Sequence, residues 1–500
     1  MTDAYHDLEQ RFSRLNALQE AAGMLHWDSS VMMPTGGAEA RSEQLAALDV
    51  TCHGMLTDPA MGDLLACAEQ ERPHLDAWQA ANLREMRRAW LHATAVPADL
   101  VEAMTRATKK SEMAWRDARP NSDFAAVRPH LEEVVRLTRE MAAAKAEALD
   151  KTPYDALLDQ FEPDGDSTEI EGVFDDLATF LPGFIDDVLT HQGRQPAPAK
   201  PEGHFPEATQ AALGRRLMRM VGFDFHHGRL DTSLHPFCGG VPEDLRVTTR
   251  YDESDFAGAM MGVLHETGHA MYERGLPERW RRQPVGEARG MALHESQSLL
   301  IEMQACRGPE VVGHLAPIFR ETFNGSGEAW SADNLRRLYT QVERSFIRVD
   351  ADEVTYPAHV ILRYRLETAM VRGELEVADL PGAWNQGMQA LLGITPPNDR
   401  LGCLQDIHWF DGALGYFPTY TMGAIAAAQL FEAARDQVPE IPSHLARGDF
   451  APLLAWLREN VHGHGSRLST DEVLTEATGR GLDPEAFKRH LRRRYLQAAE

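Results

Sequence analysis

Cysteine is scarce in this sequence. Five cysteines are scattered over 500 residues, and no two of them form a C-x-x-C pair. An odd and widely spaced set argues against a disulfide framework and for a reducing compartment. The opening residues, MTDAYHDLEQRFSRL, also lack the apolar core of a signal peptide. We therefore expect a cytoplasmic protein.

Long apolar runs and an excess of positive charge are missing as well. No run approaches the ~18 apolar residues of a membrane span. The 50 Lys and Arg residues oppose 76 Asp and Glu, for a net charge of −26. Phosphate backbones and anionic membranes would be repelled over most of such a surface. The one marked basic run, KRHLRRRY at 488–495, is typical of a helix face, so neither nucleic acid nor a membrane is an expected partner.

Helical spacing is abundant. In the first 150 residues apolar side chains recur every three or four positions, as in Leu8, Phe12, Leu15 and Leu18. Alternation typical of strands is rare, and its clearest case is LRVTTRYD at 245–252. These patterns predict a mainly α fold with a small β-sheet near residues 223–252.

The helices are expected to form one unit. The segment rich in Pro and Gly at 191–203 is short enough to be a loop between helices rather than a domain boundary. A second local signal is the S/T-x-x-E spacing of Thr168 and Glu171, which predicts a capping box. We interpret residues 1–500 as a single catalytic unit.

The stretch GVLHETGHAMYERG at 262–275 carries the strongest chemical signal. Ser254 or Asp255 is a suitable N-cap for a helix there, and Gly275 is a suitable stop. On such a helix His265 and His269 share a face and can bind one metal ion at ~2.0 to 2.1 Å.

Glu266 is rotated by about 100° from His265 on the same helix. It should therefore miss the ion and reach a water molecule beside it. A carboxylate there can take a proton from that water and pass it to a leaving amine, which is the chemistry of the H-E-x-x-H motif.

The third metal ligand is not a downstream histidine. The pattern H-E-x-x-H-x-x-G-x-x-H would need Gly and His where the chain has Tyr272 and Gly275. The next helix offers Glu287, Glu295 and Glu302 instead.

These three glutamates differ in position. Glu287 lies close to the turn after Pro284, whereas Glu295 leaves room for a loop and an antiparallel return. Glu302 is two turns further on, better placed to support a ligand or to be solvated. The spacing favours Glu295.

Further motifs occur in a fixed order along the chain: HPF at 235–237, DLRVT at 244–248, HETGH at 265–269, HESQ at 294–297, IRVDAD at 347–352 and GCLQDIHW at 402–409. Together with HWDSSVMMPTGGAEAR near the N-terminus, they resemble the motif set of the thermostable carboxypeptidase Taq family of metallocarboxypeptidases. The similarity spans essentially the whole chain.

This resemblance implies a two-lobed helical metallopeptidase with a deep active-site groove, often homodimeric, that removes single residues from peptide C-termini. It also implies that His265, His269 and Glu295 bind zinc, or cobalt as in some members, and that Glu266 is the general base.

An exopeptidase must recognise a free α-carboxylate, for which a guanidinium is well suited. Arg348 is the first candidate and Arg246 the second. The alternative is that either arginine pairs with a nearby acid, since Asp244, Asp350 and Asp352 lie close in sequence. His235 is a further substrate-binding candidate, although a histidine before proline often only caps a turn.

A tetrahedral intermediate needs a hydrogen-bond donor besides the metal. His408 lies in QDIHW, and Tyr416 and Tyr420 lie in GALGYFPTY, where a loop would carry them over the groove. Related two-lobed peptidases use a histidine and a downstream tyrosine, which favours His408 and Tyr420. Core packing is the alternative for each aromatic side chain.

Three functions compete. The first is a zinc carboxypeptidase of broad specificity, and the second is an oligopeptidase or dipeptidyl carboxypeptidase with the same metal chemistry. The third is a helical binding protein whose metal is structural or absent. Gly268, unusual inside a helix, is expected to leave space beside His269 for a neighbouring chain or substrate.

Overall fold

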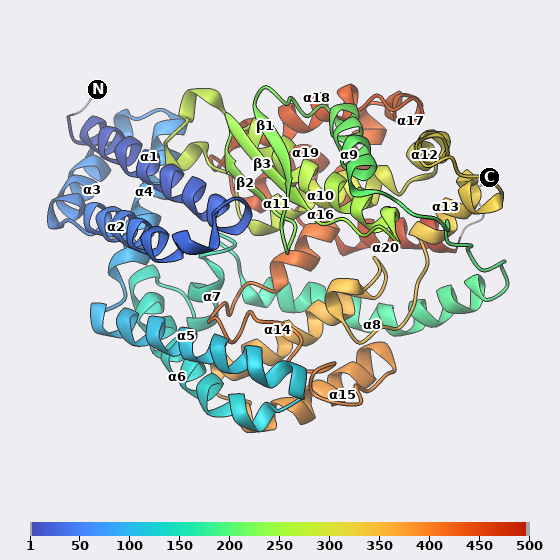
Figure 1. Ribbon diagram of the computed structural model, residues 1–500. Coiled ribbons are helices and arrows are strands. Elements are labelled where there is room, and N and C mark those ends of the chain that lie inside the picture. The colour runs from blue at the N-terminus through green and yellow to red at the C-terminus, as the bar shows by residue number, and fades with distance from the viewer. Residues whose placement is uncertain (1–2, 497–500) are drawn as a thin grey trace.

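The computed structural model describes residues 3–496 and confirms a mainly helical fold with a groove between two lobes. Figure 1 shows an upper and a lower group of helices, with the small sheet in the upper group. Within the described chain no helix is both long enough and apolar enough to span a membrane.

A group of four N-terminal helices forms the left flank of the molecule in Figure 1. They are α1 (Asp3–Val31), α2 (Ala38–Leu56), α3 (Pro59–Glu71) and α4 (Ala77–Thr94). The predicted stripe of Leu8, Phe12 and Leu15 is buried in a small core of its own. Helical spacing alone therefore located this face correctly.

The lower lobe is built around a large apolar core that includes Leu177, Ile361 and Trp384. Its helices are α5 (Ala98–Asn121), α6 (Phe124–Leu149), α7 (Pro153–Leu158), α8 (Ser167–Gln192), α14 (Tyr356–Arg372) and α15 (Leu380–Leu392).

The upper lobe has a second large core, which includes Leu217, Val263 and Leu315. Its elements are α9 (Glu207–Val221), the sheet, α10 (Phe256–Gly275), α11 (Met291–Leu299), the π-helical turn η5 (Leu300–Cys306), α12 (Pro309–Thr322), α13 (Ala332–Tyr339), α17 (Ile441–Leu445), α18 (Ala451–Asn460) and α19 (Thr470–Thr478).

Two further helices join the lobes. On α16 (Pro418–Gln437), Ile425 packs into the lower core and Leu430 into the upper one. On α20 (Pro484–Tyr495), Phe487 and Leu491 reach the lower core, and Arg494 donates to the backbone oxygens of Met303 and Gln304 in η5. The chain thus returns to each core more than once, and neither core comes from one continuous segment.

The sheet has the strand order β1-β3-β2. β1 (Gly228–Thr232) runs parallel to β3 (Asp244–Thr249), and β2 (Cys238–Val241) runs antiparallel to it. Leu245 and Val247 of β3 are buried in the upper core, where the strand packs on α10. The predicted sheet is confirmed, and it lies directly against the helix that carries H-E-x-x-H.

Helix termini partly follow the predictions. Asp255 caps α10 by accepting a hydrogen bond from the backbone N–H of Ala257, and α10 ends at Gly275 as expected. The capping box predicted for Thr168 is wrong. Asp166, two residues earlier, accepts the free N–H groups at the start of α8, because its carboxylate precedes the first helical residue.

Candidate metal centre and active-site cleft

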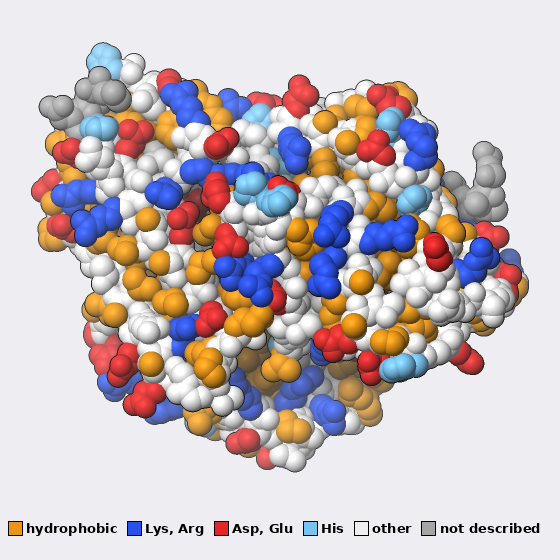
Figure 2. Space-filling model, turned by 45° about the horizontal axis from the view of Figure 1, so that its top comes forward, with side chains coloured by type: hydrophobic (Ala, Val, Ile, Leu, Met, Phe, Trp, Pro, Cys, Tyr) orange, Lys and Arg blue, Asp and Glu red, His pale blue; other side chains and the backbone are white. Residues whose placement is uncertain are grey.

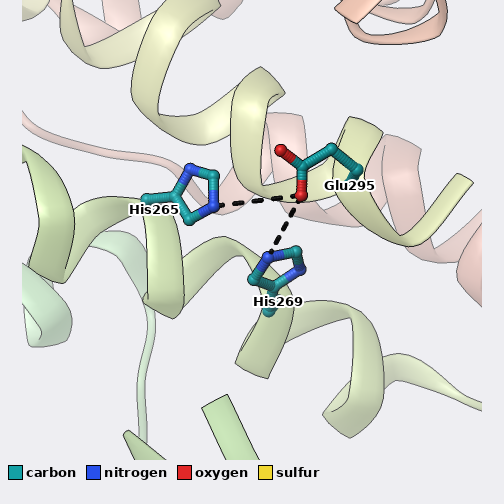
Figure 3. Close-up of side chains that lie close together, drawn as sticks. All are labelled: His265, His269 and Glu295. Carbon is teal, nitrogen blue, oxygen red and sulfur yellow. Dashed lines mark ion pairs between the residues drawn. The ribbon is translucent and has the colours of Figure 1, made fainter. Parts of the chain in front are cut away.

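Helices α10 and α11 bring the three predicted ligands together (Figure 3). Glu295 Oε2 lies 4.0 Å from His265 Nε2 and 3.6 Å from His269 Nε2. Two ligands that each lie about 2.1 Å from a shared tetrahedral ion are about 3.4 Å apart. The three donor atoms therefore surround a space of the size that one ion needs, with only modest adjustment.

Hydrogen bonds fix which ring nitrogen of each histidine faces this space. His265 Nδ1 donates to Glu302 Oε2 at 3.0 Å, and His269 Nδ1 donates to the backbone oxygen of His294 at 3.2 Å. Both Nε2 atoms consequently point toward Glu295, where a bound cation would meet them. Orientation of metal-binding histidines by such outer hydrogen bonds is the usual arrangement in metalloproteins. The donor set and its support fit a divalent ion.

Glycines allow the ligand helices to pack this closely. A Cβ atom on Gly268 would lie 2.5 Å from the Cα of Ser298, and one on Gly423 would lie 2.8 Å from the Cβ of Glu295. Gly268 thus makes room for a neighbouring chain, as predicted, and that chain is α11. Gly423 lies behind Glu295 on α16, and no sequence pattern pointed to it.

The pKa values of His265 and His269 are shifted in opposite directions. Burial alone disfavours a charged imidazole, but the hydrogen bond from His265 to Glu302 and the nearby Glu295 outweigh it and raise the pKa of His265 to about 10. The pKa of His269 falls well below its ordinary value because of burial and the neighbouring His294 and His265. A bound cation would displace any proton from both Nε2 atoms.

Glu266 has the environment of a proton carrier. Its side chain is buried beside the metal ligands, and it lines the same cleft. Burial raises its pKa to about 7, against the opposing effect of His265. A carboxyl group with this pKa can both accept and release a proton near neutrality.

The ligands open into a cleft of about 640 Å³ between the lobes. Its walls include Phe237 and Cys238 from the β2 region, Arg348 and Tyr356 from the lower lobe, and Tyr420 from α16. Figure 2 shows a hollow between the larger upper part of the molecule and the narrower lower part. A peptide chain could enter between the lobes and reach all three ligands.

Arg348 lies in the cleft wall, and its partners are not the acids close to it in sequence. Its Nε and Nη2 donate to Asp406 Oδ1 at 3.1 and 2.8 Å, and its Nη1 donates to the Tyr356 hydroxyl at 2.8 Å. Its guanidinium also lies 5.0 Å from the centre of the Tyr420 ring. Asp406 also accepts from Arg363, so one carboxylate balances two buried arginines. The Arg348 guanidinium keeps further N–H groups for a ligand.

Arg246 and His235 are not among the residues that line the cleft. Arg246 forms a two-point ion pair with Asp244 and lies over the Trp27 ring at 4.5 Å. His235 is exposed, and its backbone oxygen accepts a hydrogen bond from Ser233. Of the HPF motif that contains His235, only Pro236 and Phe237 line the cleft.

His408, Tyr416 and Tyr420 form an aromatic cluster. The His408 ring lies 5.9 Å from that of Tyr416 and 6.4 Å from that of Tyr420. Both tyrosines line the cleft, but Tyr420 belongs to the first turn of α16 rather than to a loop. Burial, together with Arg348 and against Asp406, lowers the pKa of His408 to about 4. His408 is therefore neutral and Tyr420 protonated near neutral pH, but Tyr420 lines the cleft whereas His408 does not.

Several site residues were not identified by sequence. The His294 ring stacks on that of His269 at 4.5 Å, and its Nε2 donates to Glu273 Oε1 at 2.9 Å. Tyr356 and Asp406 hold Arg348. His294 and Asp406 lie inside recognised motifs, so their positions were a usable signal, whereas Tyr356 had none.

Two other histidine pairs, His226 with His227 and His462 with His464, do not join the cluster of His265, His269 and Glu295. His462 is buried in the short turn η9 (His462–His464), where its Nε2 donates to Gln297 at 3.0 Å. His227 pairs with Asp224 at the surface. Among the described residues, the cluster of His265, His269 and Glu295 is the only one with the geometry of a metal site.

Comparison with known proteins agrees with this geometry. The family model described as carboxypeptidase Taq (M32) metallopeptidase matches residues 7–495. The chain belongs to the carboxypeptidase Taq (M32) family. It is 37% identical over 509 residues to thermostable carboxypeptidase 1 of Thermus thermophilus, with 98% of each chain covered.

Solved structures of M32 carboxypeptidases have the same fold. Metallocarboxypeptidase 1 of Trypanosoma cruzi is 40% identical, with a TM-score of 0.97 over 99% of this chain and 100% of that one. The M32 carboxypeptidase of Deinococcus radiodurans R1 is 34% identical, with a TM-score of 0.93 over 99% of both chains. The chain is accordingly a metallocarboxypeptidase, a peptide hydrolase that uses a divalent metal ion. This finding favours the carboxypeptidase prediction over the oligopeptidase and binding-protein alternatives.

Proposed function

We propose that this M32 enzyme is a zinc carboxypeptidase of broad specificity whose ion is held by His265, His269 and Glu295. The observation that carries the proposal is the convergence of two oriented Nε2 atoms on one carboxylate oxygen. Two imidazoles and a carboxylate are a common zinc donor set, and cobalt is the second candidate. A bound divalent ion would polarise the scissile carbonyl and acidify a nearby water molecule.

In this proposal Glu266 moves the proton. It takes a proton from the water that attacks the scissile carbonyl carbon, and it then delivers that proton to the amine nitrogen as the C–N bond breaks. The raised pKa of Glu266, about 7, supports both halves of this transfer. Tyr420 and His408 are proposed to donate hydrogen bonds to the oxygen that gains negative charge.

Arg348 is proposed to bind the free α-carboxylate of the substrate. Asp406 and Tyr356 hold its guanidinium in place, and they leave N–H groups directed at the cleft. Arg246 and His235 are weaker candidates, because Arg246 is occupied by Asp244 and His235 stands outside the cleft.

The assembly and location are proposed on narrower grounds. All five cysteines are free thiols, which supports the proposed cytoplasmic location. The repeated crossing of the chain between the two cores supports a single catalytic unit over residues 1–500. A homodimer rests on resemblance to the family alone, and sedimentation analysis of the purified protein tests it.

A pair of peptides and one variant test the proposed reaction. The metal-loaded enzyme should release the last amino acid from a peptide with a free C-terminus and should leave the amidated peptide intact. Glu266→Gln should keep its metal content and lose nearly all hydrolysis. Equal cleavage of the two peptides would reject single-residue release, and wild-type activity in Glu266→Gln would reject the proposed mechanism.

A further inference from the structure

A second cavity continues from the active-site cleft. It has a volume of about 830 Å³ and shares Glu302, Arg307, Val349 and Ala351 with the cleft. It extends toward the N-terminal end of α10, whereas the metal ligands stand near the middle of that helix. Since the two cavities have common walls, we call this continuation the acidic chamber.

Negative charge dominates the acidic chamber. Its lining contains six carboxylates and two basic side chains, Lys200 and Arg307; the carboxylates are Asp252, Asp255, Glu302, Glu343, Asp350 and Asp352. Arg307 is already engaged, because its Nη2 pairs with Glu302 and its Nη1 donates to the backbone oxygen of Tyr339. The chamber therefore keeps a strong negative excess.

Two of the carboxylates are free to meet a ligand. Glu343 and Asp350 are exposed, and neither side chain makes a hydrogen bond or ion pair with any described residue. Asp255 and Asp352, by contrast, accept hydrogen bonds from backbone N–H groups. Glu343 and Asp350 thus supply charge without holding the fold together.

Uncharged groups in the chamber also lack partners. The Tyr339 hydroxyl is buried in its wall and has no hydrogen-bond partner among residues 3–496. Val349, at the junction with the cleft, is 70% exposed. A buried hydroxyl and an exposed apolar side chain beside a catalytic cleft are what an extended peptide would satisfy and cover.

The charge sets the direction in which a peptide lies. The terminal carboxylate of a substrate would be repelled by this group of acids, whereas Arg348 lines the cleft but not the chamber. The residues upstream of the scissile bond must then be the ones that extend past Glu302 and Arg307. Resting on the proposed function, we propose that the acidic chamber binds this upstream segment and selects peptides with Lys, Arg or a free α-ammonium there.

Matched peptides test this selectivity. The substrates are short acetylated peptides with identical C-terminal residues, and Lys, Gln or Glu is placed in turn at each position upstream of the scissile bond. With metal-loaded wild type at low salt, kcat/KM should be about tenfold higher for Lys than for Glu at one or more positions. Added salt should reduce the ratio, because the chamber is open to water.

Variants connect the effect to the chamber. The double variant Glu343→Gln/Asp350→Asn should bring the Lys-to-Glu ratio close to one, while the Gln peptide is cleaved at nearly the wild-type rate. The control variant removes two negative charges far from the chamber, at Glu374 and Glu376, which are both exposed. These residues follow α14, a helix about 25 Å long whose first residues line the cleft. Glu374→Gln/Glu376→Gln should keep the wild-type ratio.

The results of these experiments distinguish the proposed selectivity from the proposed carboxypeptidase function. Equal kcat/KM for Lys and Glu peptides in wild type, or an unchanged preference in the chamber variant, overturns the selectivity while leaving the carboxypeptidase reaction intact. Failure of metal-loaded wild type to release the last residue of any peptide overturns the proposed function itself, and the selectivity with it.

Discussion

Gly423 on α16 lies directly behind Glu295 on α11, the proposed third metal ligand. A Cβ atom at position 423 would approach the Cβ of Glu295 to 2.8 Å and its Cγ to 2.9 Å. Real Cβ atoms do not pack at such distances, so the absence of a side chain at Gly423 determines where Glu295 stands. Because α16 also packs into both cores, the position of Glu295 depends on the packing of both lobes.

Gly423→Ala should therefore weaken metal binding by pushing Glu295 away from the two histidines. We expect a loss of about tenfold or more in affinity, measured by competition with a chelator, since support of a ligand is commonly worth this much. Gly313 in α12 has no atoms near its missing Cβ, so Gly313→Ala is the control and should bind metal normally. Unchanged affinity in Gly423→Ala would show that Glu295 can adapt.

Glu302→Ala should lower metal affinity by about 10 to 100-fold but still bind one ion when the metal is abundant. Glu302 holds His265 by a hydrogen bond to Nδ1, whereas Glu295 supplies a donor atom itself. Glu295→Ala should consequently lose the ion under conditions in which Glu302→Ala retains it. Metal analysis of both variants at several free-ion concentrations measures the order, and the reverse order would reassign the third ligand.

Arg348→Lys should impair recognition of the free carboxylate more than the chemical step. A lysine cannot reproduce the forked contacts to Asp406 and the substrate, and a lost charged hydrogen bond costs about 1.5 to 3 kcal/mol. We expect KM for a free-carboxylate peptide to rise by about tenfold or more, with a smaller fall in kcat. Discrimination against an amidated peptide should weaken as well, a change that mere loosening of the Asp406 contact would not produce.

Acid should destabilise the protein partly through His462. Burial, reinforced by Arg458, lowers the pKa of His462 to about 3, below the ordinary value of 6.5. The unfolded chain then binds a proton that the folded state excludes, so the free energy of unfolding is highest above about pH 6.5 and falls as the pH drops toward 3.

His462→Gln preserves a donor for Gln297 and removes the titrating group. Urea unfolding of the metal-free protein at a series of pH values should show a shallower loss of stability below pH 6.5, by up to about 1.4 kcal/mol per pH unit. The exposed His74 serves as the control, and His74→Gln should keep the wild-type slope. An identical slope in His462→Gln would mean that other groups dominate the acid limb.

Motif order and helical periodicity carried much of the prediction. The H-E-x-x-H spacing placed His265 and His269 on one face, and the 26 positions from His269 to Glu295 were enough for a loop and the next helix, α11. Helix and strand types depend on local alternation and spacing, which is why the sheet and the α10 boundaries were also predicted. The N-cap of α8 was predicted wrongly because two nearby side chains, Asp166 and Thr168, can each cap a helix, and Asp166 is the one that does.

Such patterns do not predict contacts between segments that lie far apart in the sequence. The pairing of Arg348 with Asp406, the packing of Gly423 against Glu295 and the wall that joins the cleft to the acidic chamber each combine residues that lie far apart in the sequence. No local spacing encodes those distances, because they arise when two lobes pack around α16. The sequence by itself thus determined which side chains are the candidates for metal chemistry, and the tertiary structure alone decided what holds them in place and where the rest of a peptide is proposed to lie.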